Sequence, residues 1–385
     1  MHKIKNSIEI VVVGCGAYTC GRGISGNYGT IIPGIFEFSR VYNAEVGSVG
    51  ITVVGFSSQG LEEARKKISD LQALVCVEVQ VRFSTVEYFQ FDAIPSSNRL
   101  MIVAVPDAEH PKWLRLAARY GYHALTVKPF VDSFEEGVEI TQLFERRGLL
   151  GYVEFHKRFD RQNILIRERL KELGELHSVT VEYSQRIEVP LGFGDWINSS
   201  NILQYLGVHY IDLVYFLTGC WPERVTCIGS GRTLLSKGFK TYDSIQALIK
   251  WSGTGQRFTQ SITASWCDPD TTSATSYQRL KISGSQFVIE SDQKRRGLQI
   301  VTDRAMSEPN PDFTNYYKTS TGIRFFGYGI DSITAVCNRV FCNISNDHLC
   351  SFSEALASTA AIDALNKSMS DDYGVWVDVR GSQRS

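Results

Sequence analysis

The most suggestive chemical group in the chain is a lysine at the end of an apolar segment. Lys128 lies in the run Thr126-Val127-Lys128-Pro129, directly after residues 123–127, which we expect to form a buried strand. The proline removes a backbone donor and favours extended geometry at the residue before it. Because open α/β sheets bind ligands beyond the carboxyl ends of their strands, Lys128 is a candidate catalytic and ligand-binding residue. The plain alternative is a surface lysine that begins a loop.

His209 is the second candidate. The segment 206–219 is typical of an apolar helix, in which His209 and Asp212, three residues apart, share one face. Since imidazole titrates near neutral pH, His209 is a candidate proton-transfer group, although a buried core histidine is the alternative. No second histidine or cysteine stands at ligand spacing, so we expect no metal site.

Two glycines follow the first apolar run, residues 8–13. Gly14-Cys15-Gly16 has the spacing that lets a tight turn bring backbone N–H groups against a pyrophosphate at a helix N-terminus. The third glycine of the usual fingerprint would fall at Thr19, and the glycine-rich stretch 21–34 resembles an insertion before the helix. The candidate residues around this turn are Ala17 and Tyr18 after the glycines, and Val105, Pro106 and His110 after a later strand.

The end of the second strand carries hydroxyl groups where an acidic residue usually binds a ribose. The sequence there is Phe56-Ser57-Ser58-Gln59. Because no carboxylate would repel a 2′-phosphate, and Arg65 and Lys66 follow in the next helix, this pattern favours NADP over NAD. The alternative is that Ser57 and Ser58 only cap the helix.

The sequence predicts two domains, the first of them built on parallel strands, that would position these residues. The chain has 385 residues, more than one core normally serves. Alternating strands and helices predict a Rossmann-type, doubly wound parallel sheet at 1–130. Residues 131–385 are expected to form an α+β substrate-binding and oligomerisation domain with a large, open, mostly antiparallel sheet, and a last helix near 353–369 could return to the first domain. The strands expected in the second sheet are 179–184, 224–228, 245–251, 258–265, 278–282 and 286–290.

Composition limits the partners. Forty basic and 41 acidic residues give a net charge of −1, which offers no electrostatic case for nucleic acid or an anionic membrane. Nine unpatterned cysteines, among them Cys76, Cys227 and Cys337 in apolar stretches, suggest reduced thiols and a cytoplasmic setting. Sheets of this kind commonly pack face to face, so we expect a homodimer or homotetramer.

Taken together, the motifs resemble those of the glucose-fructose oxidoreductase, inositol dehydrogenase and rhizopine catabolism (Gfo/Idh/MocA) family, nearly from end to end. Val103 to His110 resembles the family's strand-Pro-Asn-x-x-His segment, and Val127-Lys128-Pro129 stands where the family carries Glu-Lys-Pro. Residues 155–159 are similar to its asparagine/arginine motif, residues 173–179 to its Gly-x-Leu/Ile-Gly turn, and Gly207 to Asp212 to Gly-x-His-x-x-Asp.

The resemblance implies an NAD(P)-dependent oxidoreductase that moves a hydride between nicotinamide C4 and a ring carbon of a sugar or cyclitol. In that case Lys128 would polarise the substrate oxygen and His209 would exchange its proton. The residues implied at the substrate are Lys128, Arg158, Tyr183, Trp196, Tyr205, His209 and Asp212.

Two positions depart from the family pattern. Val127 replaces the glutamate before the lysine, and Tyr205 replaces an aspartate four residues before the histidine. A non-catalytic, cofactor-binding regulatory protein on the same fold is therefore the alternative function.

Overall fold

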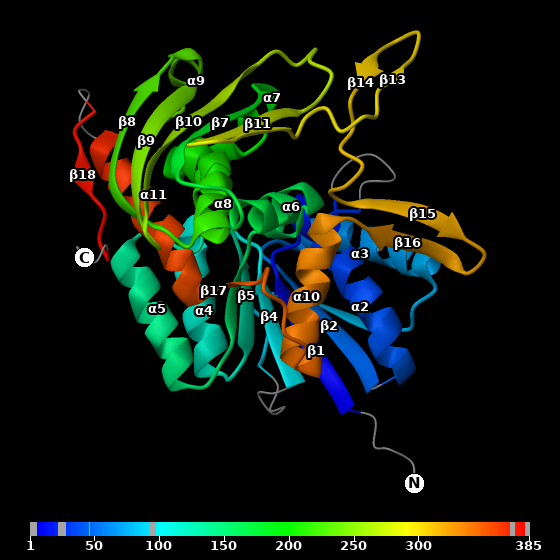
Figure 1. The fold of residues 1–385 in the computed structure, drawn as a ribbon. Coiled ribbons are helices and arrows are strands. Elements are labelled where there is room, and N and C mark those ends of the chain that lie inside the picture. The colour runs from blue at the N-terminus through cyan, green and yellow to red at the C-terminus, as the bar shows by residue number, and fades with distance from the viewer. Residues whose placement is uncertain (1–5, 22–27, 46, 92–97, 370–373, 382–385) are drawn as a thin grey trace. The chain divides into compact units, whose positions relative to one another are not determined.

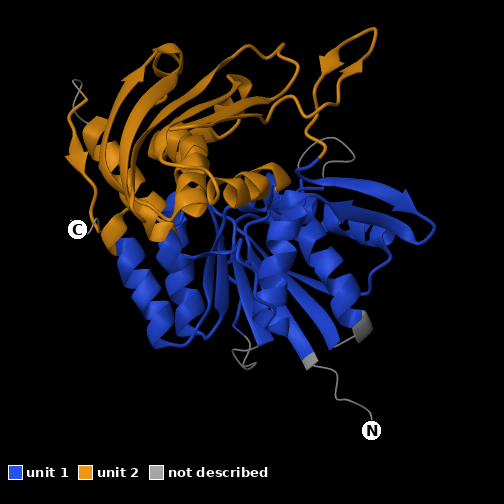
Figure 2. Ribbon diagram, in the orientation of Figure 1, with its two compact units in different colours: residues 1–130, 136–160, 312–354 blue, residues 131–135, 161–311, 355–385 orange. Residues whose placement is uncertain are grey.

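The structure, a computed structural model, describes residues 6–21, 28–45, 47–91, 98–369 and 374–381. The chain divides into two compact units, each assembled from separate stretches (Figures 1 and 2). Unit 1 contains residues 1–130, 136–160 and 312–354, and unit 2 contains 131–135, 161–311 and 355–385. The domain boundary expected after residue 130 is where the chain first leaves unit 1, but the chain enters unit 1 twice more.

Unit 1 is built on a seven-stranded sheet with the order β17-β6-β5-β4-β1-β2-β3. Strands β1 to β6 are parallel, and the short β17 adds one antiparallel edge. The order reverses between β1 and β4, which confirms the predicted Rossmann-type sheet and places its ligand crevice at their carboxyl ends. The strands are β1 (Asn6–Val13), β2 (Gly47–Gly55), β3 (Gln80–Thr85), β4 (Arg99–Val103), β5 (His123–Val127), β6 (Gly151–Glu154) and β17 (Cys350–Ser351), with a separate hairpin of β15 (Asn315–Thr319) and β16 (Gly322–Phe326).

Apolar periodicity explains the helices of unit 1. In α3, side chains three or four residues apart (Leu61, Ala64, Ile68, Leu71 and Val75) are buried, while the opposite face is charged. The central strands are buried on both faces, as runs of β-branched residues predict. The helices are α1 (Ala17–Cys20), α2 (Ile31–Glu45), α3 (Ser58–Val75), α4 (His110–Arg119), α5 (Phe134–Arg146, whose first residues belong to unit 2) and α10 (Tyr328–Cys342), with 3-10 turns η2 (Asp107–Glu109) and η3 (His156–Phe159).

The expected glycine-rich insertion at 21–34 is shorter than the sequence suggested. The one-turn helix α1 ends at Cys20, residues 22–27 lie outside the described part of the chain, and α2 already begins at Ile31. Gly34 therefore lies inside a helix. A Cβ on Gly34 would come within 2.6 Å of Ile333 of α10, so this glycine allows the two helices to pack closely.

Unit 2 contains a second seven-stranded sheet, with the order β12-β11-β7-β10-β9-β8-β18. All its pairs are antiparallel except β7 with β10, which confirms the mostly antiparallel sheet predicted from the sequence. Ile245, Ala247, Ile249 and Trp251 alternate with more exposed residues along β9, so one face of the sheet is covered. The strands are β7 (Leu176–Arg186), β8 (Trp221–Ser230), β9 (Ser244–Gly253), β10 (Gln256–Asp268), β11 (Ser276–Gly284), β12 (Val288–Asp292) and β18 (Val377–Asp378), with a small hairpin of β13 (Ile300–Val301) and β14 (Met306–Ser307).

The helices of unit 2 include an irregular turn before α8. Leu203–Gly207 (η5) is a π-helix that runs directly into α8 (Val208–Thr218), the helix that carries His209. In a π-helix the backbone hydrogen bonds join residues five apart. Tyr205 and His209, which are four residues apart in sequence, are therefore not placed as they would be in a regular α-helix. The remaining helices are α6 (Arg161–Leu170), α7 (Glu188–Leu191), η4 (Gly194–Ser199), α9 (Thr233–Ser236) and α11 (Phe352–Met369, whose first three residues belong to unit 1).

All nine cysteines are free thiols. Burial raises the pKa of Cys227 to about 11, which makes that thiol unreactive at neutral pH. Cys76, although it lies in an apolar stretch of the sequence, is exposed at the C-cap of α3, where it adopts a positive φ of 54°. None of the helices in the described ranges is both long and apolar enough to cross a membrane.

Candidate functional site

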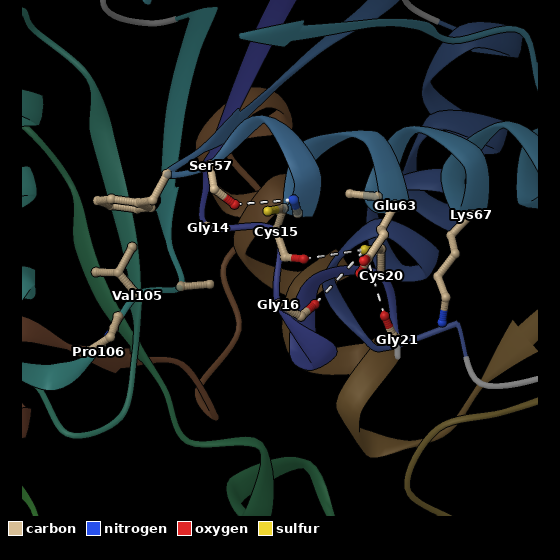
Figure 3. A pocket seen from close by; sticks show the side chains of 14 residues that line it. Gly14, Cys15, Gly16, Cys20, Gly21, Ser57, Glu63, Lys67, Val105 and Pro106 are labelled. Carbon is tan, nitrogen blue, oxygen red and sulfur yellow. Dashed lines mark hydrogen bonds between the residues drawn. The ribbon is translucent and has the colours of Figure 1, made fainter. Parts of the chain in front are cut away.

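A pocket of about 510 Å³ lies at the carboxyl ends of β1, β2 and β4 (Figure 3). It occupies the point where the strand order reverses, which is where this class of sheet binds nucleotides. Five of the cofactor residues predicted from the sequence line it: Gly14, Gly16, Ser57, Val105 and Pro106. The lining residues that the sequence did not single out as contacts are Cys15, Cys20, Gly21, Phe56, Gly60, Glu63, Ala64, Lys67 and Ala104.

Gly14 is required by the geometry of the turn after β1. Its φ is +103°, and a Cβ there would stand 2.1 Å from the carbonyl oxygen of Ala104. Thr19, at the place of the third glycine, donates its hydroxyl to the Gly14 carbonyl at 2.9 Å and so braces the turn. Ala17 begins a helix of only four residues, so the predicted phosphate site lies on a short turn rather than on a long helix.

Ser57 is the N-cap of α3, as the alternative interpretation predicted. Its Oγ accepts the backbone N–H of Gly60 at 3.1 Å, while the residue also lines the pocket. Ser58 is the first residue of the helix and does not line the pocket.

Among the basic residues in the described part of the chain, Lys67 lines this pocket, whereas Arg65 and Lys66 do not. The Arg65 guanidinium lies over the ring of Phe83, 4.5 Å from its centroid, and pairs with Glu62. Lys67 and Glu63, one helical turn apart, extend from α3 toward the Gly21 end of the pocket (Figure 3). A pocket with one acid and one base beside Ser57 does not by itself select between the two nicotinamide cofactors.

Lys128 follows β5, the strand next to β4, and its side chain is half-buried. Burial lowers the pKa of the ammonium to about 8, and the nearby carboxylates of Asp107 and Glu154 oppose this effect. A lysine with such a pKa changes its charge close to neutral pH, as proton-transfer and carbonyl-polarising groups do.

His110 has a structural part in holding the backbone around Lys128. Its ring is fully buried, with Nδ1 2.9 Å from the carbonyl oxygen of Pro129 and Nε2 3.0 Å from that of Val105. The ring therefore links the end of β4 to the segment after β5. These contacts explain why the motif has a histidine at position 110, and they require no direct contact between His110 and the cofactor.

Tyr18 and Arg158 also have partners inside unit 1. The Tyr18 hydroxyl lies 3.3 Å from His156 Nδ1, and neither Tyr18 nor Ala17 lines the pocket. Arg158, predicted at the substrate, is fully buried and donates to Glu354 Oε1 and to the Leu349 carbonyl, each at 3.3 Å. These contacts join η3 to the segment at β17, so Arg158 has partners within unit 1.

His209 and Asp212 are both buried on α8 of unit 2. Tyr183 of β7 packs edge-on against Tyr210 of the same helix, with ring centroids 5.6 Å apart. Lys128, the other residue predicted to be catalytic, belongs to unit 1, whereas His209 belongs to unit 2.

Trp196 and Tyr205 belong to an aromatic cluster in unit 2. Phe193 packs against both, at centroid distances of 4.7 and 4.9 Å, and also contacts the fully buried Trp266 at 6.2 Å. Phe193, Trp196 and Tyr205 are half-buried, so their rings are partly accessible. Partly exposed aromatic faces of this kind suit stacking against the apolar face of a sugar ring. Among the described residues, no group of three or more His, Cys, Asp or Glu side chains is placed to hold a metal ion.

Comparison with known proteins identifies the family. Residues 166–290, within unit 2, match the GFO/IDH/MocA C-terminal domain. Residues 166–290 are thus similar to that domain of the GFO/IDH/MocA family. The resemblance predicted from the motifs is thereby confirmed.

Two uncharacterized oxidoreductases of Schizosaccharomyces pombe are similar in sequence. Each is 29% identical, one over 133 residues and 33% of this chain, the other over 137 residues and 34%. Each match covers only 36% of the relative's length.

Several solved structures share the fold over nearly the whole chain. A scyllo-inositol dehydrogenase from Lactobacillus casei, with bound NAD(H) and scyllo-inositol, has a TM-score of 0.68 at 15% identity, over 97% of this chain and 99% of that one. GenD2 from gentamicin A biosynthesis, in complex with NAD, has a TM-score of 0.68 at 18% identity, over 99% and 98%. The myo-inositol 2-dehydrogenase from Lactobacillus plantarum has a TM-score of 0.69 at 13% identity, over 97% and 100%.

Proposed function

We propose that this GFO/IDH/MocA protein is an NAD(P)-dependent oxidoreductase that interconverts a ring hydroxyl and a ring ketone of a sugar, sugar derivative or cyclitol. The observation that carries the proposal is the pocket at the β1/β4 reversal, with Lys128, whose pKa is about 8, at the end of the adjacent strand β5. Proteins with the same fold, among them a scyllo-inositol dehydrogenase with bound NAD(H) and scyllo-inositol, support this class of substrate and cofactor.

The glycine turn fits a dinucleotide because no side chain can stand at Gly14. Gly14 and Gly16 would lie against the pyrophosphate, Ser57 against the ribose, and Val105 and Pro106 beside the nicotinamide half. When bound, the nicotinamide supplies the hydride acceptor or donor.

The protein's own residues would handle the substrate oxygen and its proton. The Lys128 ammonium donates a hydrogen bond to the oxygen and stabilises the negative charge that develops on it. His209 takes the hydroxyl proton during oxidation and returns it during reduction. Trp196 and Tyr205 would form an apolar wall for the ring.

We further propose that NADP is the preferred cofactor and that the protein is a cytoplasmic homo-oligomer. The absence of an acid at Ser57 supports NADP. The nine free thiols support a reducing compartment.

The test is a steady-state assay of the purified protein with NADP and NAD against sugars, sugar phosphates, nucleotide sugars and inositols. Turnover that Lys128→Ala reduces by about 100-fold or more would support the proposal. Cofactor binding without turnover, unchanged by Lys128→Ala, would instead support the non-catalytic regulatory function.

A further inference from the structure

Lys128 has a buried carboxylate on the strand at each side. Strand β5 lies between β4 and β6, and Lys128 follows it directly. Asp107 begins the turn after β4 and is 4% exposed, while Glu154 ends β6 and is 3% exposed. Glu154 is the register partner of Val127, the residue before the lysine. The sheet thus brings two carboxyl groups to the strand end where Lys128 stands.

Glu154 is held in one orientation by its own partners. Its Oε1 accepts the hydroxyl of Ser332 at 2.7 Å, and its Oε2 lies 3.2 Å from Nδ1 of His156. The imidazole is fixed in turn by stacking on Tyr328, with centroids 5.6 Å apart and planes 25° from parallel. These two contacts hold the carboxyl group of Glu154 in a defined orientation.

Tyr18 closes the other side of this cluster. Its hydroxyl lies 3.3 Å from Nδ1 of His156. Burial, and then the charge of Glu154, raise the pKa of the Tyr18 phenol well above its ordinary value. The phenol therefore stays protonated and adds no second negative charge beside Glu154.

The two carboxylates raise the pKa of Lys128, whereas burial lowers it. Burial alone drives an ammonium group toward its neutral form, whereas an opposite charge a few ångströms away favours the charged form. Asp107 has the larger of the two opposing effects and Glu154 the smaller, and the resulting pKa is about 8. With this pKa the lysine is mostly protonated at pH 7.

We propose that Asp107 and Glu154 are positioning residues that together serve as the counter-charge of Lys128, in place of the single carboxylate that Val127 does not provide. The family pattern has asparagine at the position of Asp107 and glutamate at the position of Val127. In this chain the negative charge is therefore on the segments that end strands β4 and β6, and not on the lysine's own strand β5. This inference rests on the proposed function, in which Lys128 polarises the substrate oxygen.

The other titratable groups around the lysine are accounted for by different contacts. His110, at the start of α4, faces the carbonyl oxygens of Val105 and Pro129. His156 and Tyr18 contact each other, and His156 also contacts Glu154. Asp107 and Glu154 are the charged groups whose effect on Lys128 the structure shows.

The experiment measures the titration of Lys128 directly, in the full-length protein without cofactor. The protein is labelled briefly with acetic anhydride between pH 6 and 11, and the acetylated fraction of Lys128 is quantified by mass spectrometry. The variants are Asp107→Asn, Glu154→Gln and the double variant. The midpoint is the pH at which Lys128 acetylation reaches half of its maximum. We expect this midpoint to fall by about one pH unit in each single variant and further in the double variant.

Glu9→Gln is the matched control, because Glu9 is a buried carboxylate of the same sheet that pairs with Arg82 and Thr52 instead. Its Lys128 midpoint is expected to equal that of the wild type. An unchanged midpoint in both single variants, or an equal fall in the control, would overturn the proposal. If Glu154→Gln does not fold, Asp107→Asn alone decides, because asparagine is the residue of the family pattern.

A turnover measurement separates this inference from the proposed function. If the midpoints shift but the wild-type protein turns over no substrate, the counter-charge is present and the proposed function fails. If the wild type is active and the midpoints do not move, the counter-charge inference is refuted while the proposed function stands. With both intact, the upper limb of the pH profile of kcat/KM should move with the labelling midpoint, which a purely structural role would not produce.

Discussion

The substitution Gly14→Ala tests the turn after β1 most sharply. The added Cβ would stand 2.1 Å from the Ala104 carbonyl oxygen, whereas an ordinary carbon–oxygen contact is about 3.3 Å, so the two backbones must separate by roughly 1 Å. Gly14 N–H bonds the Val54 carbonyl at 2.9 Å and Ala104 N–H bonds that of Val13 at 2.8 Å, so the movement strains both bonds.

The expected cost follows from these contacts. A positive φ at alanine costs about 1–2 kcal/mol, two weakened backbone bonds about 1–2 kcal/mol, and the remaining overlap about 1 kcal/mol or more. We therefore expect Gly14→Ala to lower the free energy of unfolding by about 3–5 kcal/mol and to displace the backbone that faces the pyrophosphate.

Gly148→Ala is the matched control. Gly148 also has a positive φ, of +62°, but a Cβ there would meet nothing within 4 Å, so only the backbone cost of about 1 kcal/mol applies. The assay is thermal unfolding with and without saturating NADP or NAD. Gly148→Ala should keep the rise in Tm caused by the cofactor, and Gly14→Ala should lose it. Equal destabilisation by the two variants, with the cofactor effect retained in both, would refute the reasoning.

Three further predictions concern the chemistry of the site. Ser57→Asp should shift the ratio of kcat/KM for NADP over NAD toward NAD by about tenfold or more, since a carboxylate repels the 2′-phosphate; an unchanged ratio would place the ribose elsewhere. In the direction of ketone reduction, kcat/KM should fall as the pH rises through about 8, because the ammonium form of Lys128 donates to the substrate oxygen; a rate that stays flat from pH 7 to 9 would contradict that role. Trp196→Ala should raise the KM for a ring substrate by about five- to tenfold while cofactor binding stays constant, as loss of a stacking face predicts; an unaltered KM would remove Trp196 from the substrate wall.

The strands and helices with a clear pattern of apolar residues could be predicted from the sequence. Apolar runs in the first domain are enough to predict its central strands β1, β2 and β4, because these strands are buried. The position of Lys128 after a parallel strand also followed, because Pro129 marks the strand end. By contrast, the return of 136–160 and 312–354 to unit 1 depends on tertiary packing, which local patterns do not encode.

Residue roles were hardest to predict where a side chain's direction decides them. Arg65 and Lys67 are both basic and both on α3, but only Lys67 faces the pocket. A helical wheel drawn from the Ser57 cap would have shown this difference, since residues 60, 63, 64 and 67 share one face. Nothing in the sequence indicated that Glu154 would serve Lys128, because their proximity arises from strand register.

The three-part composition of unit 1 has a consequence for its synthesis. Helix α10, which packs on α2 and contributes Ile330, Ile333 and Val336 to the interior, lies near the end of the chain. A ribosome must therefore translate most of the protein before unit 1 can complete its core. A fragment cut after residue 130 would expose the apolar side of α2, and we expect it to aggregate or to recruit chaperones rather than fold.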